Sequence, residues 1–105
     1  MAKTSEPDLG LAVMKVLATE TGNSASVRTL VKRASEYIKL TDEDRIPSTT
    51  RPNELVWEQR VRNLKSHDKT EGNVIKDGFV RHTGRGRYKL TDSGILHLRN
   101  KGIID

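Results

Sequence analysis

The apolar pattern at the start of the chain predicts two helices. Residues 5–8, Ser-Glu-Pro-Asp, form a capping pattern with proline in the first turn, and the apolar positions after them recur at helical spacing. They predict a helix over residues 6–20. A second apolar stripe follows Ser26, which is a suitable N-cap, and predicts a helix over residues 27–40. Residues 41–44 form another capping pattern. It can begin only a short turn, because Pro47 follows too soon for another helix.

A polar loop over residues 46–53 separates these helices from a third one. Asn53 is a good N-cap, and the pattern after it predicts a helix over about residues 54–66. One face of this helix is apolar and is predicted to join the core with Trp57, Val61 and Leu64. The opposite face carries Gln59, Arg62 and Ser66. Residues 67–73 interrupt the pattern, and residues 74–78 resemble a last helical turn closed by glycine. The sequence leaves open whether residues 67–77 continue one bent helix or form separate pieces.

The last third of the chain predicts a hairpin and a final helix. Residues 79–82 and 87–90 are predicted to form two strands, the second of which alternates between polar and apolar positions. The connector between them has glycine at two positions, as a hairpin turn requires. Thr91 is predicted to cap a helix that ends at Gly102. The residues of this helix predicted to face the core are Ile95, Leu96 and Leu98.

Charge is unevenly distributed along the chain. The 105 residues carry a net charge of +5 with a pI near 9.7. Residues 51–89 hold ten Lys or Arg against five Asp or Glu, so this segment accounts for the whole excess, and residues 79–91 hold four basic side chains and no acidic one. Such a basic region points to an acidic partner, and nucleic acid is the commonest one.

Length and composition restrict the class of protein further. The length fits one domain over residues 1–105, with residues 1–5 and 103–105 as flexible ends. The absence of cysteine excludes disulfide frameworks and zinc sites built on thiolates, and it fits a reducing compartment. No stretch approaches the roughly 18 apolar residues of a membrane span, and the N-terminus lacks the apolar core of a signal peptide. We therefore expect a cytoplasmic protein that does not contact a membrane.

Three helices followed by a basic hairpin resemble the plan of a winged helix-turn-helix domain. Residues 78–80 and 87–94 resemble the wing and following helix of that superfamily, in which an aromatic residue, a basic residue, Leu-Thr and a later glycine recur. Residues 54–62, with a Trp-x-x-Arg-Val pattern, are similar to the recognition helix of winged-helix domains attached to bacterial restriction endonucleases of the Mrr and HNH types. The resemblance covers roughly residues 50–100, and the stretch between residues 61 and 78 is longer than in that group.

The resemblance implies an α+β fold that is mostly α: a winged helix-turn-helix with three helices, a C-terminal two-stranded wing and a further helix. It implies that the domain binds double-stranded DNA through a recognition helix over about residues 54–66 and a basic wing over residues 79–90. A separate nuclease domain, in cis or in trans, is then expected to perform cleavage. Several domains of this group are linked to the reading of modified bases, so recognition of a modified base belongs to the hypothesis.

Three groups of residues are candidates for contact with DNA. Gln and Arg on the outer face of the third helix can form two hydrogen bonds each to the edge of a base. Hydroxyl groups and an Arg just before that helix are suited to bind phosphate. A basic hairpin is suited to bind phosphate or to enter the minor groove. The candidates are Gln59, Arg62 and Ser66 on the helix, Ser48, Thr49, Thr50 and Arg51 before it, and Arg85, Arg87 and Lys89 on the hairpin. Each group also has a structural alternative: a solvated helix face, a polar loop, or cations that keep an edge strand from aggregating.

No catalytic, metal or cofactor site is predicted. A phosphate-cradling loop with a GK[ST] ending and a Gly-x-Ser-x-Gly elbow are both missing from the sequence. The histidines, His67, His82 and His97, fall in different predicted elements without metal-ligand spacing. Trp57 is in phase with the apolar face of its helix, which favours a core position over base stacking. We expect a non-enzymatic binding domain that is a monomer or a weak dimer.

Other functions stay open at this point. The domain could serve protein contacts, or act as a transcriptional regulator without a nuclease partner, although a protein-binding wing usually exposes apolar residues instead of Arg and Lys. The charge fits RNA as well, but the sequence lacks the exposed aromatic platform that single-stranded RNA usually requires.

Overall fold

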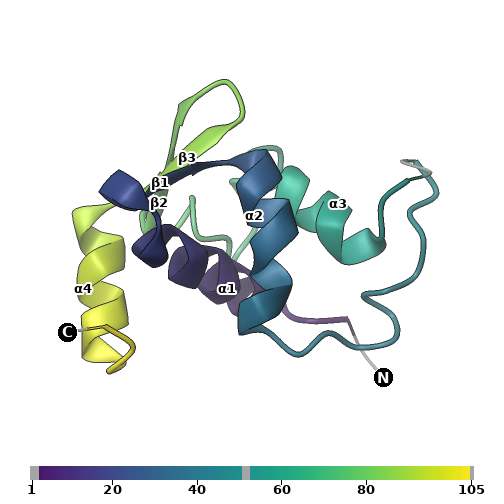
Figure 1. The fold of residues 1–105 in the computed structure, drawn as a ribbon, viewed down its shortest axis with the longest axis horizontal. Coiled ribbons are helices and arrows are strands. Elements are labelled where there is room, and N and C mark those ends of the chain that lie inside the picture. Colours follow the sequence, from purple (N-terminus) through teal and green to yellow (C-terminus); the bar gives the residue numbers. More distant parts are fainter. Residues whose placement is uncertain (1–2, 51–52, 105) are drawn as a thin grey trace.

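Four α-helices and a three-stranded antiparallel sheet make up the described part of the chain, residues 3–50 and 53–104 of a computed structural model (Figure 1). The elements follow in the order α1 (Glu6–Thr19), β1 (Ser24–Ser26), α2 (Val27–Arg33), α3 (Val56–Arg62), β2 (Val80–Gly84), β3 (Arg87–Leu90) and α4 (Asp92–Asn100). Two 3₁₀ turns, Thr21–Asn23 and Ala34–Tyr37, follow α1 and α2. The α+β class predicted from the sequence is confirmed.

The sheet has the strand order β1-β3-β2, so β3 is hydrogen-bonded on both sides. Ser24 lies opposite Lys89 in the pair of β1 and β3, and Val80 lies opposite Leu90 in the pair of β2 and β3. The β2–β3 hairpin confirms the two predicted strands. Strand β1 is not among the strands predicted from the sequence. Its three residues are too few and too polar to show a strand pattern, and they pair because β3 offers an edge.

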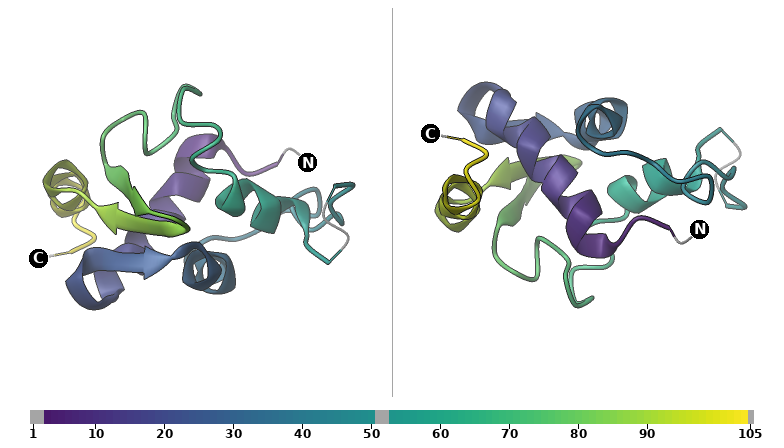
Figure 2. Two further views of the ribbon diagram at one scale, coloured as in Figure 1. Left: turned by 90° about the horizontal axis from the view of Figure 1, so that it is seen from above. Right: turned by 90° about the horizontal axis from the view of Figure 1, so that it is seen from below.

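Helix α1 lies across one face of the sheet and supplies the centre of the core (Figure 2). Ser5 Oγ accepts a hydrogen bond from the Asp8 N–H at 3.2 Å, as the capping pattern predicts. The buried residues of the helix are Leu9, Gly10, Ala12, Val13, Met14, Val16 and Leu17. Each buried Leu, Val or Met side chain contributes about 1.5–3 kcal/mol relative to an exposed one. This packing leaves the opposite face of the sheet, seen from above in Figure 2, turned away from α1.

Helices α2 and α3 are both shorter than the sequence pattern predicts. The predicted helix over residues 27–40 is α-helical only to Arg33 and continues as a 3₁₀ turn to Tyr37. Ser26 caps its start as predicted, because its Oγ accepts a hydrogen bond from a backbone N–H in the first turn. The predicted helix over residues 54–66 begins only at Val56 and ends at Arg62.

The start of α3 is set by the loop before it. The N–H groups of Val56 and Trp57 donate to the carbonyl oxygens of Ile46 and Asp44, at 2.8 and 3.0 Å. This backbone pairing satisfies the first amides of the helix, so the predicted N-cap Asn53 lies outside it and Leu55 takes that position. The three predicted core residues are buried: Trp57 and Val61 lie on α3, and Leu64 lies in the turn after it.

The segment between α3 and β2 is a series of turns held by one buried amide. Asn73 is fully buried, and its Nδ2 donates to Glu6 Oε2 at 3.0 Å and to the Leu64 carbonyl oxygen at 3.2 Å. Its Oδ1 accepts a hydrogen bond from the Ile75 N–H at 2.8 Å. Asn73 therefore joins three parts of the fold: the start of α1, the end of α3 and the turn before β2.

Helix α4 packs against the root of the β2–β3 hairpin. Thr91 Oγ1 accepts a hydrogen bond from the Gly94 N–H at 3.0 Å and donates one to the Gly78 carbonyl oxygen at 2.5 Å. A Cβ atom on Gly94 would overlap the backbone carbonyl group of Phe79. Only glycine allows α4 to approach the hairpin this closely, which gives a physical reason for the Leu-Thr-x-x-Gly pattern that follows β3.

Leu96 corrects one detail of the predicted core. Its side chain is 57 % exposed, although the apolar pattern placed it inward. Two residues correspond to about 200° around a helix, so Leu96 lies opposite both Gly94 and Leu98, which are buried. Ile95 packs against the core as predicted, and Gly102 ends the segment with a φ of 73°.

A buried carboxylate joins the N-terminal segment to the loop before α3. The side chain of Asp44 is fully buried and accepts hydrogen bonds from the Thr4 N–H at 2.9 Å, the Thr4 hydroxyl at 2.5 Å and the Thr41 N–H at 2.9 Å. Nη1 of Arg60, on α3, lies 3.9 Å from Asp44 Oδ1. Burial alone would raise the pKa of Asp44, but the hydrogen bonds from Thr4 and Thr41 outweigh it, and the net pKa is lowered.

We expect Asp44 to make the stability of the domain depend on acid pH. Its pKa in the folded state lies below the ordinary value of 3.8, so its contribution is fully present above that value. The contribution is lost as the pH falls through the folded pKa. Asp44→Asn should lower the free energy of unfolding by about 1–3 kcal/mol at pH 7 and by less at pH 3. Urea unfolding at both pH values measures this, with the exposed Asp42→Asn as control. The same loss for Asp44→Asn at both pH values would contradict it.

Candidate nucleic-acid interface

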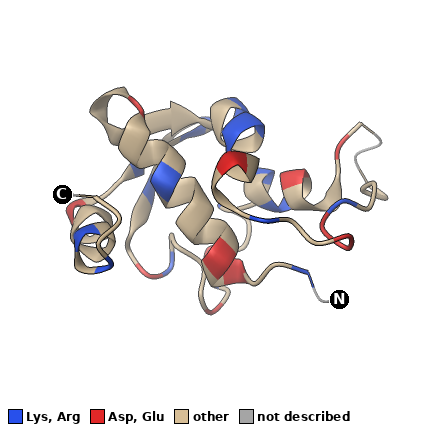
Figure 3. Ribbon diagram, turned by 60° about the horizontal axis from the view of Figure 1, so that its bottom comes forward, with Lys and Arg blue, Asp and Glu red and all other residues tan. Residues whose placement is uncertain are grey.

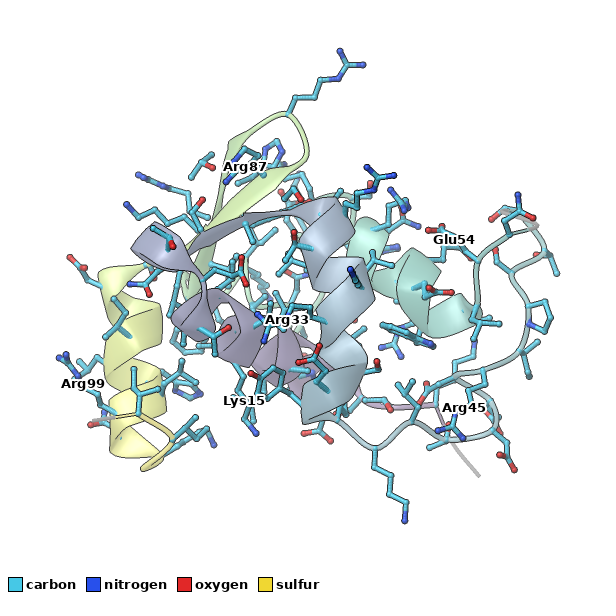
Figure 4. All side chains as sticks on the ribbon, in the orientation of Figure 1. Lys15, Arg33, Arg45, Glu54, Arg87 and Arg99 are labelled. Carbon is cyan, nitrogen blue, oxygen red and sulfur yellow. The ribbon has the colours of Figure 1, made fainter. Side chains whose placement is uncertain are left out.

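The β2–β3 hairpin projects from the body of the domain and carries exposed cations (Figures 1 and 4). Arg85 lies in the turn between the strands, where Gly86 has a φ of 68°. Arg87 and Lys89 are exposed and alternate along β3 with residues that are buried against α1. The structure therefore brings the three predicted wing contacts together on one projecting surface.

Arg81 joins this surface from the neighbouring strand. It is exposed and lies directly opposite Lys89 in the register of β2 and β3. Like charges in this position repel each other by about 0.2–1 kcal/mol. Neither side chain has a hydrogen bond or ion pair with another described residue. Sequence reasoning did not select Arg81, and only the hairpin register could have placed it beside Lys89. We refer to Arg81, Arg85, Arg87 and Lys89 as the wing cations.

The first turn of α2 packs against the β2–β3 hairpin. The Val27 N–H donates to the Gly86 carbonyl oxygen at 2.7 Å. Arg28 and Lys32 lie one helical turn apart on α2 and are both exposed, and Figure 3 shows the basic positions of this helix. Neither residue is paired with another described residue. Helix α2 thus adds two cations close to the wing, which sequence reasoning missed because it concentrated on the basic segment 51–89.

Gln59 is held by two hydroxyl groups from the loop before α3. Ser48 Oγ donates to Gln59 Oε1 at 2.5 Å, and Gln59 Nε2 donates to Thr50 Oγ1 at 2.8 Å. Ser48 is 6 % exposed, whereas Thr50 is open to solvent. The structure therefore joins one predicted base contact and two predicted phosphate contacts in a single cluster.

Arg62 is paired with Glu54, which precedes α3 in the chain. Its Nε donates to Glu54 Oε1 and Oε2 at 3.1 and 2.9 Å, and its Nη2 donates to Oε2 at 2.6 Å. The hydrogen bonds to Glu54 raise the pKa of Arg62 above its usual value. Both side chains are partly shielded, with 14 % of Glu54 and 32 % of Arg62 exposed. The sequence pattern gave no sign of this pair.

The remaining predicted contacts lie at the margins of this surface. Thr49 is exposed in the loop before α3. Ser66 is exposed too, but it lies in a turn beyond the end of α3, so the prediction that it shares the helix face with Gln59 is wrong. Arg51 lies outside the described residues.

A family model described as the Mrr N-terminal domain matches residues 8–100, from the first turn of α1 to the last residue of α4. The chain belongs to the Mrr N-terminal domain family. This confirms the resemblance to domains associated with Mrr-type restriction endonucleases. No curated protein and no solved structure matches the chain significantly.

The described part of this Mrr N-terminal domain contains no group of three or more His, Asp or Glu side chains placed to hold a metal ion. Two of the histidines contact aromatic rings: His97 stacks on Phe79 with ring centroids 4.3 Å apart, and His82 lies against Tyr88. Trp57 is 6 % exposed and belongs to the core, as predicted. None of the described helices is long and apolar enough to span a membrane.

Proposed function

We propose that this Mrr N-terminal domain binds double-stranded DNA with the exposed face of α3 and the wing cations. In this proposal it is the recognition module of a restriction system and performs no chemistry itself. Membership in the Mrr N-terminal family supports a restriction context, because a domain of this kind is separate from the nuclease domain that it accompanies.

The element order supports a winged helix-turn-helix arrangement. Helices α2 and α3 pack against each other, β1 precedes them, and the β2–β3 hairpin follows them and lies beside the start of α2. In a helix-turn-helix domain the second helix of the pair enters the major groove. Helix α3 takes that place here, and the hairpin is then positioned to contact the phosphate backbone beside it.

The uncompensated charge of the wing carries the proposal. The wing cations are exposed, two of them face each other across the strands, and none has an acidic partner among the described residues. Phosphate groups would relieve this repulsion and release counterions from the DNA. A protein partner is less well supported, because the exposed large apolar side chains of the described chain, Ile46 and Leu96, lie on different elements.

Fluorescence anisotropy with a labelled random duplex of about 20 base pairs tests the proposal. We expect binding that weakens steeply between about 50 and 200 mM salt, with a slope of log K against log salt of about −5. This slope corresponds to the wing cations together with Arg28 and Lys32, each of which neutralises about one phosphate. An RNA duplex should compete poorly. Absence of binding at about 50 mM salt would contradict the proposal.

The same measurement with methylated duplexes tests the reading of modified bases. We expect the domain to prefer a duplex methylated at adenine or cytosine over the unmodified duplex of the same sequence. A preference of this kind cannot come from phosphate contacts, because these are identical in the two duplexes. Equal affinities would remove modified-base recognition from the proposal and leave general or sequence-specific DNA binding.

A further inference from the structure

We infer that Glu54 is a positioning residue for base recognition, which holds Arg62 so that its free end meets a guanine instead of a phosphate. The inference rests on the proposed DNA binding and adds a specificity-determining residue to it.

The hydrogen-bonding pattern of the pair supports this role. Glu54 occupies Nε and one N–H of Nη2, whereas Nη1 has no hydrogen bond with a described residue. A guanidinium has five N–H donors, so the Nη1 end of Arg62 keeps donors for a ligand. Guanine presents O6 and N7 in the major groove as two adjacent acceptors, which two guanidinium N–H groups can bind together.

Gln59 is positioned in the same way on the neighbouring turn of α3. Its amide bonds to the hydroxyl groups of Ser48 and Thr50, and it lies three residues before Arg62, so the two side chains share one helix face. One N–H of its amide remains for a base. Both side chains are therefore ordered before DNA arrives, which avoids an immobilisation cost of about 0.5–1.5 kcal/mol per side chain.

The charge of Glu54 adds a second effect on specificity. A carboxylate beside the DNA-facing side of α3 repels phosphate, and it neutralises an Arg that would otherwise bind the backbone of any sequence. The pair should therefore lower the affinity for random DNA while it keeps the contact to one base. Removal of the carboxylate should have the opposite effects.

A randomised duplex pool, bound to the domain, separated and sequenced, tests the inference. The unchanged domain should enrich guanine at one position at least, and Arg62→Ala should lose that enrichment. Glu54→Gln should lose the enrichment at the same position, while its affinity for the unselected pool rises about threefold or more and its salt slope steepens by about 0.9. The matched control is Glu36→Gln, which makes the same charge change at an exposed residue beyond α2 and should alter neither quantity.

The outcomes separate the inference from the proposed function. If Glu54→Gln keeps the guanine enrichment that Arg62→Ala loses, the positioning role is wrong and DNA binding stands. If the bound pool shows no enriched position, the inference is wrong, but the proposed DNA binding stands. If the unchanged domain retains no duplex, the proposed function fails and the inference fails with it. Thermal unfolding checks that each variant is folded, and Glu54→Ala replaces Glu54→Gln if the latter is not.

Discussion

Replacement of both Arg85 and Arg87 by glutamate is expected to weaken duplex binding by at least about 100-fold at moderate salt. Each charge-assisted hydrogen bond to a phosphate contributes about 1.5 kcal/mol, and the loss of two of them corresponds to that factor. The salt slope should become shallower by about 1.8, because two fewer phosphates are neutralised. Both residues are exposed on the projecting hairpin, so the fold should tolerate the change. Anisotropy titrations across a salt series measure both quantities.

The matched control moves the same charge change away from the wing. Lys39 and Lys101 are exposed, and they lie beyond α2 and beyond α4. Their joint replacement by glutamate should weaken binding only through the net charge, by a factor well below that of the wing variant. If the two double variants lose the same affinity, the wing makes no specific contact and only the overall charge attracts DNA.

Asn73→Ala is expected to lower the free energy of unfolding by about 3–4 kcal/mol, the largest loss that we expect from a polar residue in this fold. The change leaves the Leu64 carbonyl oxygen and the Ile75 N–H without their side-chain partner at a fully buried position. The change removes two hydrogen bonds to backbone groups, which contribute about 0.5–1.5 kcal/mol each, and a third to the Glu6 carboxylate, which contributes about 1.5–3 kcal/mol. Chemical denaturation of the two proteins measures the difference.

Asn100→Ala is the control for this prediction. Asn100 is exposed at the end of α4, so its replacement should change the free energy of unfolding by less than about 0.5 kcal/mol. A loss for Asn73→Ala as small as that of the control would mean that water replaces the buried amide and that the segment before β2 is not held by it.

The regular elements with strong local patterns could be predicted from the sequence. The capping box at Ser5 and the apolar repeat after it define α1, and the alternation of Arg87 to Leu90 defines β3. Strand β1 could not be predicted, because its three residues become a strand only when β3 lies beside them. The start of α3 likewise depends on backbone hydrogen bonds from a distant loop, which no local pattern encodes.

The candidate interface was predictable in its charges and not in its contacts. Alternation along β3 placed Arg87 and Lys89 on the outer face correctly. The partners of Gln59 and Arg62 depend on the course of the loop before α3, which a sequence of polar residues and prolines does not determine. For this reason the helical periodicity placed both side chains on the outer face of the helix but gave no partner for either, whereas the structure holds both of them in hydrogen bonds.

The central position of β3 in the sheet affects how the proposed complex with DNA would form. This strand is paired along both edges, and the turn beyond it is hydrogen-bonded to the first residue of α2. Movement of the hairpin relative to β1 and α2 would therefore break these backbone hydrogen bonds, which favours one orientation of the wing cations in the free protein. In the proposed complex, a duplex that contacts both the wing cations and α3 would then have to adjust to them by a change of groove width or by a bend. Because the energy of such a deformation depends on base sequence, even base pairs that no side chain touches would contribute to the choice of site.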